Sequence, residues 1–521
     1  MSDQEHAVRQ VRGSSVLLFG RVMSLAVNLL LQLLLVRYFA KEVFGAFAFA
    51  WASVELGTFL VTAGLNKSLS RYIPLYQEAG DWPKVRQSVV RSLCVMLALG
   101  LASVVVLELL NDWVARHGWV DPLSLRLLRI MIILVPLDAI GFLFQDLFVA
   151  FQDITAVFVR RYIVAPGLRL AGVIGVMVAG GGAEAMAYGY VAGGAIGLLL
   201  YLWMFRRLWR ERMQGDSTVT QETPRFGELV RFGLAVLTSQ LGTMVRMTAV
   251  VFLLQFLRNA EEVGDYRAVL PFARLNLMVL DSFTIAFVPA AARLLSRGEE
   301  RKIGRLVDTC STWVAVLGFP IFLASFALSP TLSRYVLGEN YADTWPIMSA
   351  LSIGFLAESL LGFAPQVLRA YARLRPVLIA DFAALALNLI IAMILIPHWG
   401  ALGAAIGVVA SSLAAAVGVM VAARRVNRWA CRWSTVGGLL LVTGGTALVV
   451  AVGLQLWELP LVVQALLAAA ACLFVLQAYR RRLVVDDVFP EVRKLPFIGW
   501  LVPARAPEPV VASSASSVSE P

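Results

Sequence analysis

Charged residues are scarce in this chain, which excludes an ordinary soluble protein. Only 15% of the 521 residues are charged and 59% are hydrophobic, with a mean hydropathy of +0.77, whereas an average soluble domain carries about 25% charged residues. Three histidines (His6, His117 and His398) support no catalytic Ser/His/Asp set. The four cysteines lack metal-ligand spacing. This composition indicates an integral membrane protein with many spans.

The motifs of membrane enzymes are missing as well. No glycine-rich phosphate loop ends in Lys-Ser or Lys-Thr, and the acidic pair Asp486-Asp487 stands alone. An oligosaccharide polymerase is expected to carry a large charged outer loop, but the longest outer connection here, around Asn111 to Leu125, is short. We therefore predict that the protein is not an enzyme and has no catalytic residue, metal or cofactor. Coupling to H+ or Na+ is left open.

Long apolar runs fill most of the chain. About 20 apolar residues are needed to cross the hydrocarbon core as a helix, and this window predicts an all-α protein with about fourteen transmembrane helices. The first run begins too early and extends too far for a cleaved signal peptide, so we expect it to remain as an anchor. The predicted spans are 13–37, 43–65, 88–110, 127–151, 158–179, 183–205, 226–257, 263–292, 309–328, 344–371, 376–396, 401–421, 436–457 and 459–478.

Basic residues are distributed unevenly between the predicted loops. If the N-terminus is cytoplasmic, the connections after even-numbered spans are cytoplasmic too, and these carry most of the Lys and Arg residues. This positive-inside bias places both termini of the multi-pass protein in the cytoplasm. The formal charge of +11 is therefore explained by the basic residues of the cytoplasmic loops. It fits contact with anionic membrane lipids and does not indicate a nucleic-acid partner.

A polar interruption at 206–225 divides the chain after the sixth span. Residues 42–47 (EVFGAF) resemble 261–266 (EEVGDY), and prolines Pro74 and Pro289 follow at similar distances. Parallel repeats of this kind occur in transporters that rock two halves about a central site. We predict two six-helix lobes related by a pseudo-two-fold axis along the membrane normal, at 1–205 and 226–425. A cytoplasmic linker at 206–225 joins them, followed by an accessory helix pair at 426–482 and a cytoplasmic tail at 483–521, disordered at its end.

Three charges fall within the predicted span 263–292. Arg267, Arg274 and Asp281 recur at intervals of seven residues, which keeps them on one face of a helix. A charge near the bilayer centre costs at least about 2.5–3.5 kcal/mol, so such residues usually face a bundle interior or a watery cavity. This stripe predicts a polar path through the protein.

Other spans carry buried polar residues that extend this path. Asn28 and Gln32 share a helical face with Arg21, and interhelical hydrogen bonds explain the two amides equally well. For the arginines, ion pairs with carboxylates are the alternative to cavity lining. Because Arg21, Arg246 and Arg274 lie deep within their spans, snorkelling explains them least well. The carboxylates on these faces are Glu55, Asp138 and Asp281.

Several motifs carry a family resemblance. Residues 36–47 (VRYFAKEVFGAF) and 63–72 (AGLNKSLSRY) resemble the polysaccharide-transporter branch of the MOP exporter superfamily, as do Gly20-Arg21 and 263–267 (VGDYR). The resemblance covers roughly 13–421, and fourteen spans fit it. It implies a Wzx-type flippase of the bacterial inner membrane, which moves an undecaprenyl-diphosphate-linked oligosaccharide from the cytoplasmic to the periplasmic leaflet for O-antigen, capsule or exopolysaccharide biosynthesis. The family's cavity arginine in the first span corresponds to Arg21.

That cargo assigns roles to the polar residues. Guanidinium groups can bind phosphate oxygens bidentately, and amides and carboxylates suit sugar hydroxyls. The expected partners are the lipid-linked oligosaccharide and membrane lipids, with a polysaccharide polymerase and glycosyltransferases as further candidates. The predicted substrate-binding residues are Arg21, Asn28, Gln32, Arg246, Arg267 and Arg274, and the residues predicted to set cavity charge or carry a coupling cation are Glu55, Asp138 and Asp281.

Two other functions fit the same fold. A multidrug exporter of the MATE type would move small, often cationic solutes, which a cationic cavity disfavours, although the acidic residues keep it open. A lipid II flippase differs mainly in the sugar, and the sequence does not separate it from the polysaccharide reading. A membrane glycosyltransferase or polymerase is less favoured.

Overall fold

The computed structural model describes residues 20, 23–151, 163–212, 225–428, 432–457, 459–480 and 483. Within these residues the secondary structure is helical, and nine helices are long and apolar enough to cross a membrane, or up to eleven if each of two bent pairs is one span. The predicted all-α polytopic fold is confirmed. The predicted number of fourteen differs because two predicted spans form one broken helix, and two others lie only partly within the described residues, as the helices Met23–Tyr38 and Ala165–Val178.

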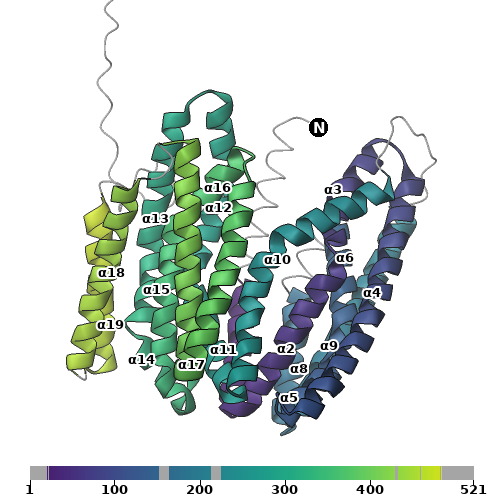
Figure 1. Cartoon of the computed structure of the whole chain (residues 1–521), viewed down its shortest axis with the longest axis horizontal. Helices are drawn as coiled ribbons and strands as arrows, with labels where there is room; N and C mark the ends of the chain where they lie inside the picture. Colours follow the sequence, from purple (N-terminus) through teal and green to yellow (C-terminus); the bar gives the residue numbers. More distant parts are fainter. Residues whose placement is uncertain are drawn as a thin grey trace, which may run out of the picture.

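The first half of the chain forms one group of helices, here called the N-terminal bundle (Figure 1). The last helix of this group continues to Arg212, so the first part of the predicted linker 206–225 is helical. The helix Met23–Tyr38 precedes the group. Its members are α2 (Lys41–Thr62), α3 (Leu65–Glu78), α4 (Trp82–His117), α5 (Pro122–Met131), α6 (Leu134–Ala150), α8 (Ala165–Val178) and α9 (Ala183–Arg212).

The second half forms the C-terminal bundle, and α10 (Phe226–Leu257) runs between the two groups (Figure 1). The last two helices pack on α13, at the side of this bundle away from the first. The members are α11 (Ala260–Arg274), α12 (Asn276–Ser296), α13 (Glu300–Phe326), α14 (Ser329–Leu332), η2 (Ser333–Leu337), η3 (Glu339–Thr344), α15 (Trp345–Leu361), α16 (Phe363–Ala370), α17 (Arg375–Val426), α18 (Trp433–Leu456) and α19 (Leu461–Tyr479).

The two bundles meet where α2 and α11 begin, at the lower end of Figure 1, here called the α2–α11 end. Gly45 and Gly264 allow this contact because a Cβ atom at Gly45 would lie 1.6 Å from the carbonyl oxygen of Ala260, and one at Gly264 would lie 2.4 Å from that of Lys41. Each glycine thus faces the residue four positions before the other. A two-fold relation between α2 and α11 would produce this reciprocity, and the two glycines are the pair matched in the sequence repeat.

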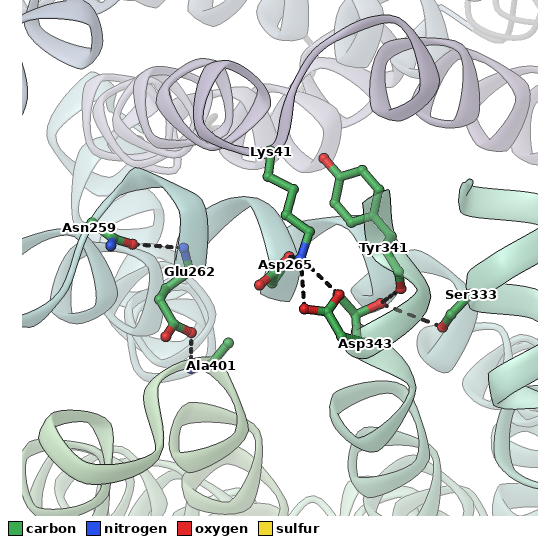
Figure 2. Close-up of polar contacts among 9 residues, drawn as sticks. Lys41, Asn259, Glu262, Asp265, Ser333, Tyr341, Asp343 and Ala401 are labelled. Atoms are coloured by element: carbon green, nitrogen blue, oxygen red, sulfur yellow. Dashed lines mark hydrogen bonds and ion pairs between the residues drawn. The ribbon is translucent and has the colours of Figure 1, made fainter. Parts of the chain in front are cut away.

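The break in α17 is stabilised by residues at the α10–α11 connection. Gly400 has φ 51° and ψ −130°, a left-handed conformation that favours glycine. On one side of the break, Arg258 Nε donates to the carbonyl oxygen of Ile396 at 3.1 Å. On the other, the backbone N–H of Ala401 donates to Glu262 Oε2 at 2.7 Å (Figure 2). A cation at a helix C-terminus and an anion at a helix N-terminus both complement the helix dipole, so this connection holds the two halves of α17.

Candidate functional site

Two adjoining polar cavities lie between the bundles, with volumes of about 680 and 810 Å³. The first is lined mainly by the helix Met23–Tyr38, α2, α11 and α12, and the second by α2, α6, α10 and α11. The residues that line both cavities are here called the junction: Trp51, Arg169, Arg267, Leu270 and Arg274.

The structure places the stripe of three charges at the cavity wall. Arg267, Arg274 and Asp281 all line the first cavity, together with the predicted amides Asn28 and Gln32. Glu55 and Asp138 line the second. Seven of the nine predicted site residues therefore surround one polar space.

The sequence spacing placed the three charges on one straight helix, but in the structure this helix is broken. The axes of α11 and the first part of α12 differ by 44°, with the break after Arg274. Pro271 lies in the last turns of α11 and has no N–H to donate to the carbonyl of Arg267, four residues earlier, which favours a kink. The bend places Arg274 and Asp281 on differently inclined parts of the wall.

The carbonyl oxygen that Pro271 leaves without its helical donor is bonded by Gln32. The Nε2 atom of Gln32 donates to the carbonyl oxygen of Arg267 at 3.1 Å. The interhelical hydrogen bond considered for Gln32 in the sequence analysis is therefore present, and it links the first helix to α11. Asn28 instead bonds the carbonyl oxygen of Ser24 in its own helix at 2.7 Å.

Replacing Gln32 with Leu is expected to lower the free energy of unfolding by about 0.6–1.7 kcal/mol, the range for interhelical hydrogen bonds in membranes. The change leaves the Arg267 carbonyl without its donor. Thermal unfolding of the purified protein in detergent would measure the loss. Asn28→Leu is the matched control because Asn28 makes no hydrogen bond to another described helix. Equal destabilisation by both changes would contradict this role for Gln32.

Glu55 connects two members of the junction. Its Oε2 atom lies 3.3 Å from Nη2 of Arg267, across the two bundles, and its Oε1 accepts a hydrogen bond from Trp51 Nε1 at 2.8 Å. The ion pair considered as the alternative for the arginines is therefore present for Arg267. Arg267 still faces the cavity, since its side chain is 18% exposed.

Arg246 occupies a different place from the one predicted. It is buried, donates to Ser412 Oγ of α17, and does not line either of the two cavities described above. Its backbone carbonyl accepts from Asn388 Nδ2 at 3.4 Å. The predicted contact of Arg246 with substrate stays a prediction, since its guanidinium is bonded to Ser412 of α17, while Ser239 and Thr243 of the same helix line the second cavity. Arg21, the remaining predicted site residue, lies outside the described residues.

The sequence analysis missed Arg169. It lies on α8, is half-buried at the junction, and places its guanidinium 5.3 Å from the ring centre of Trp51. Cations at this distance from an indole ring are attracted by the ring face. The available signal was a single charge inside the apolar span 158–179, where no stripe of polar residues drew attention to it.

Positive charge is concentrated in the first cavity. Its lining contains three arginines (Arg169, Arg267 and Arg274) and one carboxylate, Asp281. The second cavity is closer to balance, and one of its carboxylates, Asp146, pairs with Lys67 at 2.9 Å within the N-terminal bundle. An anionic group is therefore favoured in the first cavity and at the junction.

Charged residues also hold the α2–α11 end together. Lys41 Nζ of the N-terminal bundle lies 3.0 Å from Asp265 Oδ1 and 2.8 Å from Asp343 Oδ1, both of the C-terminal bundle (Figure 2). Arg37 Nε donates to the carbonyl oxygen of Val336 at 2.8 Å. Gln255 of α10 donates to Asp121 Oδ1 at 2.6 Å. This end is closed by polar contacts between the bundles as well as by the glycine contact.

A polar space between two bundles of membrane-spanning helices is typical of membrane transporters. Comparison with known proteins gives the family: the polysaccharide biosynthesis protein family matches residues 10–295, and the chain belongs to it. The MatE family matches residues 234–394. Both are transporter families, so the prediction that the protein is not an enzyme is confirmed. None of the curated proteins compared with the chain matches it.

Solved structures show the same fold. The lipid II flippase MurJ in an inward closed conformation superimposes with a TM-score of 0.67 at 14% identity, covering 91% of this chain and 99% of that one. An inward-facing multidrug resistance MATE transporter gives a TM-score of 0.64 at 16% identity, covering 78% and 95%. A MOP superfamily transporter from Pyrococcus furiosus gives 0.54 at 17% identity, covering 81% and 95%.

Proposed function

We propose that the protein is a flippase that moves a polyprenyl-diphosphate-linked oligosaccharide from the cytoplasmic to the periplasmic leaflet for cell-surface polysaccharide biosynthesis. The observation that carries this proposal is the arginine-rich junction between the bundles, within a chain of the polysaccharide biosynthesis family. A diphosphate needs cationic partners in a low-dielectric cavity. Asn28 and the carboxylates of the walls suit sugar hydroxyls.

In this proposal the chain crosses the membrane fourteen times, in two six-helix lobes at 1–205 and 226–425. The linker at 206–225 and both termini are cytoplasmic, with the accessory pair at 426–482 and the tail at 483–521. The helix break at Gly400 supports separate eleventh and twelfth spans, and the Gly45–Gly264 contact supports a two-fold relation of the lobes. The positive-inside bias supports an inner-membrane orientation with the α2–α11 end on the periplasmic side. The structure then corresponds to a state closed toward the periplasm.

Transport follows from rocking of the lobes about the junction. The diphosphate enters from the cytoplasmic side and meets Arg274, the lipid tail stays in the bilayer between the lobes, and the sugars fill the cavities. Closure of the cytoplasmic side and opening of the α2–α11 end would then release the cargo into the outer leaflet. Polysaccharide polymerase and glycosyltransferases are proposed partners on the two sides of this step.

The test is transport of a fluorescent undecaprenyl-diphosphate oligosaccharide in vesicles that contain the full chain. Arg274→Gln and Arg267→Gln are each expected to lower the initial rate about tenfold or more, because a hydrogen bond to a charged group contributes about 1.5–3 kcal/mol. Arg129→Gln is the control, since Arg129 pairs with Glu108 at 2.6 Å and does not line either cavity. Full activity in both cavity variants would refute the proposal.

The MATE-like exporter is the second candidate, because the MatE family matches 234–394 and carboxylates line the second cavity. Glu55 and Asp138 would then carry Na+ or H+ and the cavity would take an organic cation. Export of a cationic dye driven by an ion gradient, lost in Asp138→Asn, would favour this candidate over the flippase.

A further inference from the structure

The three arginines at the junction differ in what they already bind. Arg267 is paired with Glu55. Among the described residues, Arg169 and Arg274 have neither a hydrogen bond nor an ion pair. Their guanidinium groups face the same space from different bundles, Arg169 from α8 and Arg274 from the last turn of α11.

Trp51 positions Arg169 without using its hydrogen-bond donors. The ring attracts the guanidinium through its face at 5.3 Å, and the indole N–H is itself held by Glu55 Oε1 at 2.8 Å. A guanidinium carries five N–H donors in its plane and remains charged. A contact with a ring face leaves these donors available to a ligand.

Two cations without partners in one membrane cavity are costly. Arg169 is half-buried, so it loses part of its hydration, and it has only the longer-range attraction of Asp138 in return. Arg274 is exposed to the cavity, and the two like charges repel across a medium of low dielectric. An anion with two separate negative centres removes both costs, because each centre can accept paired N–H donors from one guanidinium.

We propose that Arg169 and Arg274 form a clamp for a diphosphate, with one phosphate group on each guanidinium. The clamp rests on the proposed function for the identity of the cargo, and it adds Arg169 as a binding residue from the N-terminal bundle. Because the two arginines belong to different bundles, a diphosphate bridges them, whereas a single phosphate satisfies one. Arg267 stays on Glu55 and orders the wall between them.

The clamp is tested by calorimetric titration of the purified full chain with inorganic pyrophosphate and, separately, with inorganic orthophosphate. Arg169→Gln and Arg274→Gln are each expected to weaken pyrophosphate binding about tenfold or more and to remove the preference for pyrophosphate over orthophosphate. Arg169→Lys keeps the charge over Trp51 but not the planar fork, so it should retain part of the affinity.

Arg71→Gln is the matched control, since Arg71 also lies over an aromatic ring, 4.5 Å from the centre of Phe232, and does not line either cavity. Melting temperatures of all variants establish that they fold. Unchanged pyrophosphate binding in Arg169→Gln, or equal affinities of the wild type for pyrophosphate and orthophosphate, would overturn the clamp.

If the clamp binds pyrophosphate as expected but vesicles do not move the lipid-linked oligosaccharide, the proposed function fails and the clamp stands. If transport is normal in Arg169→Gln, the clamp fails and the proposed function stands.

Discussion

Replacing Gly45 with Ala is expected to prevent the α2–α11 end from closing. The added Cβ atom would lie 1.6 Å from the carbonyl oxygen of Ala260 and 2.8 Å from the backbone N of Gly264. Both obstacles are backbone atoms of α11, so a change of side-chain rotamer cannot relieve the overlap and the helices must separate. Forced overpacking of ordinary side chains already costs about 1–3 kcal/mol. Transport by this variant is expected to fall to background.

The measurement is the distance between two spin labels near the other end of the bundles. Cysteines in place of Arg86 and Leu374, both exposed, would carry the labels on a background without the four native cysteines. Gly45→Ala is expected to shift the dominant distance. Gly318→Ala is the matched control, because no atom lies within 4 Å of a Cβ built at that helical glycine. A wild-type distribution and normal transport in Gly45→Ala would show that the contact is not needed.

In the proposed transport cycle, replacing Lys41 with Met is expected to shift the balance between the closed and open states of the bundles about tenfold or more toward an open α2–α11 end. Lys41 is largely buried, at 12% exposure, and lies on Asp265 and Asp343 of the other bundle. Its removal leaves Asp265, also only 15% exposed, without its cation. Leaving one member of a buried charge pair without its partner costs about 2–5 kcal/mol, and the closed state bears this cost because the pair is formed there.

The same pair of spin labels measures this shift without any substrate. Lys67→Met is the matched control, because Lys67 also lies 2.9 Å from an aspartate, Asp146, but both residues belong to the N-terminal bundle. The control should destabilise that bundle without changing the distance between the bundles. If both variants give the same distribution as the wild type, Lys41 does not hold the closed state.

The sequence predicted the membrane class, the positions of the helices and seven polar residues of the cavity walls for a physical reason. Charges inside apolar runs are rare enough to mark a polar interior, so Arg267, Arg274 and Asp281 could be assigned from spacing on one helix. The contact that closes the α2–α11 end could not be predicted from the sequence, because the sequence shows Gly45 and Gly264 only as matching positions of a repeat.

The structure departs from the predicted placement where the neighbouring helix decides what a side chain contacts. Arg246 shares a stripe with Ser239 and Thr243, which line the second cavity, but the packing of α10 on α17 places its own guanidinium on Ser412. Arg169 stands alone in its span, and its role depends on Trp51 from another helix. The break after Arg274 follows Pro271, whose effect on the axis was not included in a seven-residue spacing.

The path of α10 has a mechanical consequence. Its first turn is fixed to α3, where Ser68 Oγ donates to the carbonyl oxygen of Leu229 at 2.8 Å, and its last turns are fixed to α17 through Arg246 and Arg258. Figure 1 shows the helix curving from one group to the other. A change of angle between the groups is therefore expected to bend residues 234–245, between these contacts, and this stretch supplies Ser239, Gln240 and Thr243 to the wall of the second cavity. A molecule resting on that wall would stiffen the segment that has to flex, so occupancy and the energy barrier to motion are linked through a single helix.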